Sequence, residues 1–182
     1  MSDVGEPDYR IGKTLFSSEE ICERVRALAD EIVSDTSTGE LLVVGILNGA
    51  AIFLSDLVRH MPPALDVKID FMSISSYGEA VKSSGAVRIL KDLSSDIAER
   101  DVLVVEDIID TGFTLSYLLN VLWARKPANL RTCVFLDKHE RREVPVDIDY
   151  CGFAIPDVFV VGYGLDCGGK WRHLRDMHAV EF

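Results

Sequence analysis

Hydrophobic residues along the chain fall into short continuous runs, separated by stretches with helical periodicity. Four runs have the composition of strands buried on both faces: 41–47, 102–105, 132–136 and 158–161. Residues 50–60 and 111–125 have the apolar spacing of helices, and the second helix is expected to end before Pro127. Non-alternating strands joined by helices predict an α/β protein, in which a parallel twisted sheet is covered by helices on both faces.

A helix is expected before the first strand, because Ser17 and Glu20 have the spacing of a capping box. Its apolar positions share one face: Ile21, Val25, Leu28 and Ile32. Residues 66–90 differ, since apolar and polar positions alternate on either side of a Ser/Gly-rich segment, 73–85. We expect two half-buried strands there, joined as an antiparallel hairpin by a long flexible loop.

The length of 182 residues is typical of one domain, so we expect residues 1–182 to form a single unit. With 19 basic and 30 acidic residues the net charge is −11, which disfavours nucleic acid or a membrane as a partner. The four cysteines form no CxxC pair, and the charged N-terminal residues contain no apolar targeting segment. We therefore expect reduced thiols and a cytoplasmic protein.

Polar and flexible residues follow the predicted strands at their carboxyl ends, where open parallel sheets bind ligands. Asn48–Gly49 follows the first run, Glu106–Asp107 the second and Asp137–Lys138 the third. A glycine-rich segment, 162–166, follows the last run. We therefore expect glycines, carboxylates and one lysine to meet at a single edge of the sheet.

The segment Val102–Leu115 combines these features. Its buried strand leads into Glu106 and Asp107, and Asp110 comes directly before Thr111–Thr114 at the expected start of a helix. Backbone amides and hydroxyls at a helix N-terminus bind phosphate, and glycine allows close approach. Neighbouring carboxylates would repel a phosphate unless they face hydroxyl groups or a metal ion. A sugar phosphate meets both conditions, because its ring hydroxyls can donate to the acids.

Residues Glu106–Gly112, preceded by Val102–Val105, resemble the phosphoribosyl-pyrophosphate signature of type I phosphoribosyltransferases. The resemblance extends over nearly the whole chain. Its further matches are Leu47–Gly49, Ser76–Tyr77, Asp137–Lys138, and Asp157–Tyr163 through Asp166 and Arg172. It implies the type I phosphoribosyltransferase fold, with a small hood formed by the N- and C-terminal segments. It also implies assembly as a homodimer or homotetramer.

The activity implied by the resemblance is a Mg²⁺-dependent reaction of purine salvage. The 5-phosphoribosyl group of phosphoribosyl pyrophosphate would pass to N9 of hypoxanthine or guanine, giving IMP or GMP plus pyrophosphate. Glu106 and Asp107 would bind the ribose hydroxyls close to one magnesium ion, and Asp166 would bind a second. The 5′-phosphate would lie on three residues of the following turn: Thr111, Gly112 and Thr114.

The resemblance also implies contacts to the pyrophosphate and a lid. Arg172 would reach the pyrophosphate, together with the backbone amides of Asn48 and Gly49. Many family members have a lysine or arginine where this chain has Asn48, so the resemblance does not decide whether the Asn48 side chain also contacts pyrophosphate. Ser76–Tyr77 would close over the site and exclude water.

For the purine, the resemblance implies four contacts. Asp110 would act as the acid/base group at N7, and Lys138 would donate to the 6-oxo group. Phe159 would stack on the ring, and the Val160 backbone would contact its edge. Lys138 and Phe159 together disfavour adenine and pyrimidines as substrates. Apart from Lys138, we expect the charged run 138–143 to be a solvated loop.

Other interpretations have weaker support in the sequence. Gly162, Gly164 and Gly168 lack the spacing of a dinucleotide-binding loop. Asp107 and Asp110 lie three apart, which does not fit the nucleophile motif of haloacid-dehalogenase phosphatases. Two alternatives stay open: an RNA-binding transcription attenuator with a phosphoribosyltransferase-like fold, which the negative charge disfavours, and a sibling enzyme that prefers xanthine.

Overall fold

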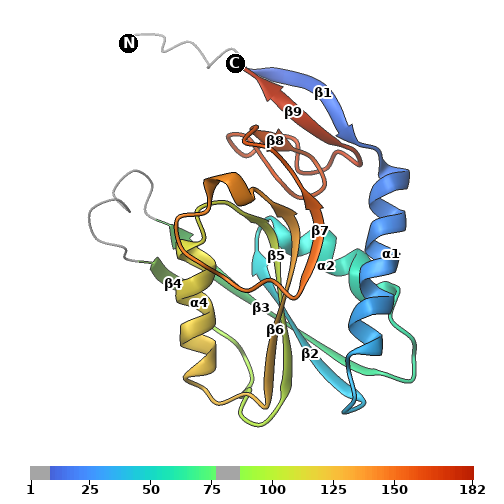
Figure 1. Ribbon diagram of the computed structural model, residues 1–182, viewed down its shortest axis with the longest axis vertical. Coiled ribbons are helices and arrows are strands. Elements are labelled where there is room, and N and C mark those ends of the chain that lie inside the picture. Colours follow the sequence, from blue (N-terminus) through green and yellow to red (C-terminus); the bar gives the residue numbers. More distant parts are fainter. Residues whose placement is uncertain (1–8, 77–86) are drawn as a thin grey trace.

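A six-stranded sheet with the strand order β4-β3-β2-β5-β6-β7 forms the centre of the computed structural model, which describes residues 9–76 and 87–182 (Figure 1). Its strands are β2 (Glu40–Leu47), β3 (Asp66–Ser76), β4 (Val87–Lys91), β5 (Asp101–Ile109), β6 (Asn129–Asp137) and β7 (Tyr150–Ala154). All neighbours are parallel except β3 and β4, which form the predicted antiparallel pair. Tyr77, assigned to the expected lid, lies outside the described residues.

Helices cover both faces of this sheet, as the sequence predicts (Figure 1). Helices α1 (Ser18–Ser34) and α2 (Ala50–Arg59) pack on one face, and α4 (Phe113–Trp123) packs on the other. The capping box of α1 is confirmed: the Glu20 amide donates to Ser17 Oγ at 3.3 Å, and the Ser17 amide donates to Glu20 Oε2 at 2.8 Å. The predicted apolar face of α1 is buried: Ile21, Val25, Leu28 and Ile32.

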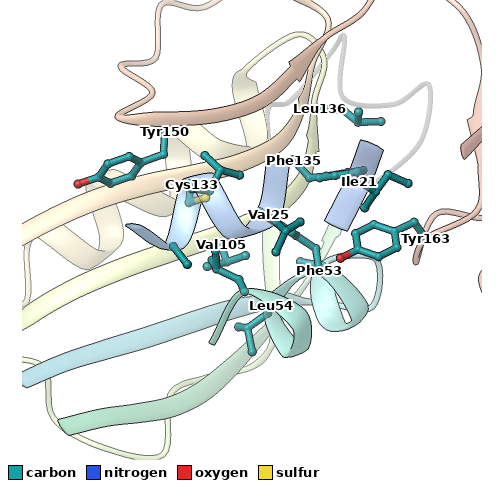
Figure 2. Close-up of a cluster of buried hydrophobic side chains, with 14 of the residues drawn as sticks. Ile21, Val25, Phe53, Leu54, Val105, Cys133, Phe135, Leu136, Tyr150 and Tyr163 are labelled. Atoms are coloured by element: carbon teal, nitrogen blue, oxygen red, sulfur yellow. The ribbon is translucent and has the colours of Figure 1, made fainter. Parts of the chain in front are cut away.

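Aromatic rings connect the C-terminal segment to the core under α1 and α2. The Phe135 ring on β6 lies 5.1 Å from Phe53 on α2 and 4.9 Å from Tyr163, centroid to centroid. Figure 2 shows Tyr163 next to Phe53 and Ile21 in this cluster. The Tyr163 hydroxyl donates to Asp56 Oδ2 at 2.9 Å, so its polar end is satisfied as well. This packing holds the segment around Tyr163 against the main sheet.

A second, three-stranded antiparallel sheet lies beyond the end of the main sheet (Figure 1). It contains β1 (Arg10–Phe16), β9 (Met177–Glu181) and β8 (Val160–Val161) in that order. The two ends of the described chain therefore pair with each other, which gives the expected hood. The Val180 amide of β9 donates to the Phe159 carbonyl at 2.8 Å, so the hood also holds the segment before β8.

The prediction of a buried main-sheet strand at 158–161 is wrong. Only Val160 and Val161 form a strand, and they pair with β9 in the small sheet. Pro156 precedes this segment and Gly162, with a φ of +101°, ends it, so the chain has no room for a longer strand. The Phe159 side chain is 46% exposed instead of lying in the core.

The sixth strand of the main sheet is β7, which the hydrophobic pattern did not predict. It is a short edge strand containing Gly152, where a Cβ atom would overlap the carbonyl oxygen of Phe135. Its outer edge is protected by Arg24 of α1, which donates to the carbonyls of Cys151 and Gly152. The strand β7 packs through the close approach of Gly152 to Phe135 and through contacts at the sheet edge. Its sequence therefore needs no continuous apolar run, and none is present.

None of the four cysteines, all of which lie in the described residues, is in a disulfide. Cys133 and Cys167 are buried, whereas Cys22 is exposed. Burial raises the pKa of Cys133 far above its usual value. The expectation of reduced thiols stays a prediction. Within the described residues, no helix is both long enough and apolar enough to cross a membrane.

Replacing Ser17 by alanine should lower stability, because the alanine leaves the Glu20 amide without its capping acceptor. We expect a loss of about 1 kcal/mol, which corresponds to a Tm decrease of about 2–4 °C for a chain of this size. Ser18→Ala is the matched control, since the Ser18 hydroxyl contacts the exposed Glu19 at 3.3 Å and caps nothing. Thermal unfolding of both variants measures the difference; equal decreases would contradict the capping role.

Candidate active site

The carboxyl ends of β2, β5 and β6 meet at one edge of the main sheet, and two hollows open there. The larger, of about 500 Å³, is called the base hollow below, and the smaller, of about 150 Å³, the phosphate hollow. Residues predicted from the sequence line the base hollow: Asp107, Asp110, Lys138, Phe159, Val160 and Asp166. Others line the phosphate hollow: Glu106, Thr111, Gly112 and Thr114. Ile108 and Asp110 line both hollows, so the two are neighbours.

The phosphate hollow lies at the N-terminus of α4, which begins later than predicted, at Phe113. Gly112 is the residue before the helix and has a φ of +91°, a conformation that favours glycine. A Cβ atom there would lie 2.6 Å from the Val144 carbonyl oxygen. The first turn of α4 therefore presents free amides and the Thr111 and Thr114 hydroxyls to a space suited to a phosphate.

Backbone hydrogen bonds attach the turn after β5 to the segment after β6. The Lys138 amide donates to the Ile109 carbonyl at 3.0 Å, and the Glu143 and Val144 amides both donate to the Thr111 carbonyl at 3.0 Å. Arg142 Nε donates to the Asp110 carbonyl at 3.2 Å, and its guanidinium pairs with Asp137. Residues 139–143 are largely exposed, as expected for a solvated loop, but through Arg142 and these backbone bonds the segment also supports the site.

Glu106 and Asp107 lie in β5 itself, since the strand continues to Ile109 rather than ending before them. Desolvation raises the pKa of Glu106 well above its usual value, and the negative charge of Asp107 raises it further. Desolvation also raises the pKa of Asp107, although the Ile108 amide, which donates to Asp107 Oδ1 at 2.8 Å, partly opposes this. The pair therefore favours a bound proton, cation or hydroxyl donor.

The turn after β2 packs directly on this acid pair. A Cβ atom at Gly49 would overlap the Asp107 carboxylate, and a Cβ atom at Gly164 would overlap the Gly49 carbonyl. The peptide between Leu47 and Asn48 is cis. Glycine is required at both positions because three backbone segments converge on Asp107. The structure thus brings Asn48 and Gly49 to the acid pair, as the sequence predicts for the pyrophosphate contact.

Arg172 and Asp166, predicted for pyrophosphate and magnesium, form an ion pair with each other. Arg172 also donates to the Gly164 carbonyl at 2.6 Å, and the Gly169 amide donates to Asp166 Oδ2 at 2.7 Å. Desolvation raises the pKa of Asp107, but the positive charge of Arg172 is close enough to oppose this rise, and Asp166 lines the base hollow. Ser76 is the last residue of β3, at the carboxyl end of that strand.

The donor groups fit magnesium only in part. In the described part of the chain, no three His, Cys, Asp or Glu side chains are arranged to hold a metal ion by themselves. Glu106 and Asp107 nevertheless form no ion pair with a described residue, and desolvation raises the pKa of both, although the charge of Arg172 acts in the opposite direction on Asp107. Mg²⁺ commonly binds through one or two carboxylates plus substrate oxygens. The acid pair fits that arrangement, with the remaining ligands supplied by substrate and water.

The base hollow contains a buried cation and a buried acceptor. Lys138 is 7% exposed, and its ammonium pairs with Asp157 at 3.6 Å, beyond hydrogen-bonding distance. Asp110 Oδ1 is the one buried side-chain oxygen or nitrogen among the described residues without a hydrogen bond. Arg141 Nε approaches it to 2.8 Å, but not with hydrogen-bond geometry. Phe159 adds an exposed aromatic face to the same hollow.

Sequence analysis assigned no role to three residues of this site: Arg141, Arg142 and Asp157, the last of which it named only as part of a matching segment. Arg141 pairs with both Asp110 and Asp157, while Arg142 attaches the loop to the turn after β5. Their sequence context is a charged run typical of surface loops, and Asp157 follows a proline in an irregular segment. The 3₁₀ turn His139–Arg141 brings Arg141 to the base hollow, where it meets Asp157 from the segment between β7 and β8.

The model of the phosphoribosyl transferase domain family matches residues 12–167, which include the acid pair and the phosphate hollow. This chain therefore belongs to the phosphoribosyltransferase family, as the motif after β5 indicated. Within the family, it is similar to proteins that act on 6-oxopurines. The hypoxanthine-guanine phosphoribosyltransferase of Aquifex aeolicus is 50% identical over 172 residues, covering 93% of this chain and 94% of the relative.

Solved structures show the same relationship. A hypoxanthine-guanine phosphoribosyltransferase of Bacillus anthracis, with a HEPES molecule in its active site, is 44% identical, with a TM-score of 0.89. The match covers 93% of this chain and 99% of that one. The hypoxanthine phosphoribosyltransferase of Trypanosoma cruzi, whose C-terminal region has been examined for its role in oligomeric state and activity, is 39% identical, with a TM-score of 0.89. That match covers 97% of this chain and 94% of that one.

Glu106→Gln should increase stability at neutral and alkaline pH. The raised folded-state pKa means that the wild-type protein loses stability as pH rises from about 4.5, the ordinary value, through the folded value. The neutral amide avoids this loss, and each kcal/mol regained raises Tm by about 2–4 °C. Thermal unfolding at pH 8 and at pH 4 measures the difference, which should shrink at the lower pH. Glu23→Gln, on the exposed face of α1, should show no such pH-dependent gain.

Proposed function

We propose that this protein transfers the 5-phosphoribosyl group of phosphoribosyl pyrophosphate to N9 of hypoxanthine or guanine, giving IMP or GMP and pyrophosphate. One observation carries the proposal: Lys138 and Asp110 present a buried donor and a buried acceptor that makes no hydrogen bond, in the same hollow. A 6-oxopurine carries a carbonyl O6 and an N7–H side by side on one edge, which complements this pair. The family membership and the named relatives support the same assignment.

The side chains around the hollows give each part of the substrates a partner. The purine would stack on Phe159, with its edge at the Val160 backbone, O6 at Lys138 and N7 at Asp110. The 5′-phosphate would bind the amides at the start of α4 and the threonine hydroxyls. The ribose hydroxyls would donate to Glu106 and Asp107, whose desolvated carboxylates favour a hydrogen-bond donor or a cation. Pyrophosphate would contact the turn at Asn48 and Gly49, and Arg172.

In the reaction, N9 of the purine forms a bond to C1 of the ribose while the bond from C1 to the pyrophosphate oxygen breaks. The electron pair leaves with pyrophosphate, and the transition state has oxocarbenium character, as in glycoside chemistry. Asp110 accepts the N7 proton as the purine becomes the nucleophile. We propose Mg²⁺ as the cofactor, held by the acid pair and by Asp166; when bound, it would neutralise charge on pyrophosphate. Ser76–Tyr77 would act as the lid that excludes water.

The proposal also covers the cellular compartment and the oligomeric state of the protein. Four free cysteines support a reducing, cytoplasmic compartment. A homodimer or homotetramer is supported by the family resemblance, and oligomeric state is a property described for the T. cruzi relative. The net charge of −11 argues against nucleic acid as the ligand.

Measuring pyrophosphate release with hypoxanthine, guanine, xanthine and adenine tests the activity directly. A site built to pair with O6 should favour hypoxanthine or guanine over adenine by about 10⁴ in kcat/KM. Activity should disappear with excess EDTA and return with added Mg²⁺. Comparable rates with adenine would overturn the base assignment, a dominant rate with xanthine would favour the sibling activity, and full activity in EDTA would overturn the cofactor.

Lys138→Gln should reduce activity on hypoxanthine and narrow the preference over adenine. Glutamine lacks the charge that complements O6, but its amide oxygen can accept from the adenine amino group. We expect kcat/KM for hypoxanthine to fall by at least about tenfold, the cost of losing a hydrogen bond to a charged group. Lys126→Gln is the control, since Lys126 is exposed at the far end of α4. Equal losses on both bases would contradict the role of Lys138.

A further inference from the structure

Four side chains of alternating charge lie in a row along the wall of the base hollow. Arg141 Nε is 2.8 Å from Asp110 Oδ1, and Arg141 Nη1 is 3.3 Å from Asp157 Oδ1. Lys138 Nζ is 3.6 Å from that same Asp157 oxygen. The row therefore connects Asp110, proposed to accept from N7 of the purine, to Lys138, proposed to donate to O6.

These side chains come from three separate parts of the chain. Asp110 follows β5, Lys138 and Arg141 belong to the turn after β6, and Asp157 lies between β7 and β8. Backbone hydrogen bonds fix Lys138 relative to the turn after β5, but they do not fix the direction of the Asp110 carboxylate. Arg141 makes the contact that links this carboxylate to both other parts.

Arg141 differs in kind from its neighbour Arg142. The Arg142 side chain is 16% exposed, and its Nε donates to the backbone carbonyl of Asp110. The Arg141 side chain is 45% exposed, lines the hollow and pairs with two carboxylates. Ion pairs this exposed contribute little to stability. Removing Arg141 should therefore leave the fold intact while changing the arrangement of the charged groups that meet the purine.

We propose that Arg141 is a positioning residue of the base site: it directs the Asp110 carboxylate toward N7, while Asp157 fixes Arg141 relative to Lys138. This inference rests on the proposed function. Arginine suits the task because its planar group presents several N–H donors and can bind two carboxylates at once, which an ammonium does less well. Because Asp110 Oδ1 makes no hydrogen bond to Arg141, its acceptor capacity stays available for N7–H.

A double-mutant cycle with Asp110 tests the proposal. Steady-state kinetics with hypoxanthine and phosphoribosyl pyrophosphate would be measured for Arg141→Met, Asp110→Asn and the double variant. Arg141→Met should lower kcat/KM for hypoxanthine by about tenfold, with an unchanged KM for phosphoribosyl pyrophosphate. Arg141→Met should have no further effect in the Asp110→Asn background, because the carboxylate that Arg141 directs is gone. Arg141→Lys should fall between wild type and Arg141→Met.

Arg125→Met provides the matched control, since Arg125 also pairs with a carboxylate, Asp92, but lies outside both hollows. Its kinetics should equal those of the wild type. The proposal is overturned if Arg141→Met lowers kcat/KM equally in both Asp110 backgrounds, if it raises KM for phosphoribosyl pyrophosphate as much as KM for hypoxanthine, or if it has no effect. Absence of phosphoribosyl transfer by the wild-type protein would instead overturn the proposed function itself.

Discussion

The carbonyl of Thr111 accepts two backbone amides, from Glu143 and Val144, and this contact fixes the turn between β5 and α4 to the segment after β6. Both hollows depend on it. On one side, Gly112 and the start of α4 form the phosphate hollow; on the other, Asp110 and Lys138 line the base hollow. Because the same turn is part of both, the separation between a bound phosphate and a bound base is set by backbone rather than by flexible side chains.

An acidic protein that binds anions must do so by local means. The net charge of −11 offers no general attraction, so the start of α4, a few glycine-lined turns and Arg172 provide the positive or donor groups. The acid pair in β5 goes further, since desolvation raises the pKa of both carboxylates and their ionised forms therefore destabilise the free fold, although the charge of Arg172 partly opposes this at Asp107. Such an arrangement is typical of functional sites, where the groups that bind a ligand lower the stability of the free protein.

The sequence predicted those features that depend on local patterns. Continuous apolar runs predicted the positions of β2, β5 and β6. The motif at the end of β5 predicted the acid pair, Asp110 and the phosphate hollow. Features that depend on the path of the chain were missed. The strand β7 depends on Gly152 approaching Phe135, residues 158–161 join the hood rather than the main sheet, and Arg141 meets Asp110 only because the 3₁₀ turn folds back. Hydrophobic periodicity contains no information about such long-range contacts.

The pairing of β1 with β9 makes the two hollows differ in how much of the chain they need. The residues that line the phosphate hollow all lie between Glu106 and Leu115, and the backbone contact that holds their turn reaches only to Val144. The base hollow needs Phe159, whose carbonyl is held by Val180 in a sheet that joins Arg10 to Glu181. Contacts of such large sequence separation close long loops, which costs conformational entropy. The segment that carries Phe159 is therefore tied to both ends of the described chain, whereas no residue that lines the phosphate hollow belongs to either end.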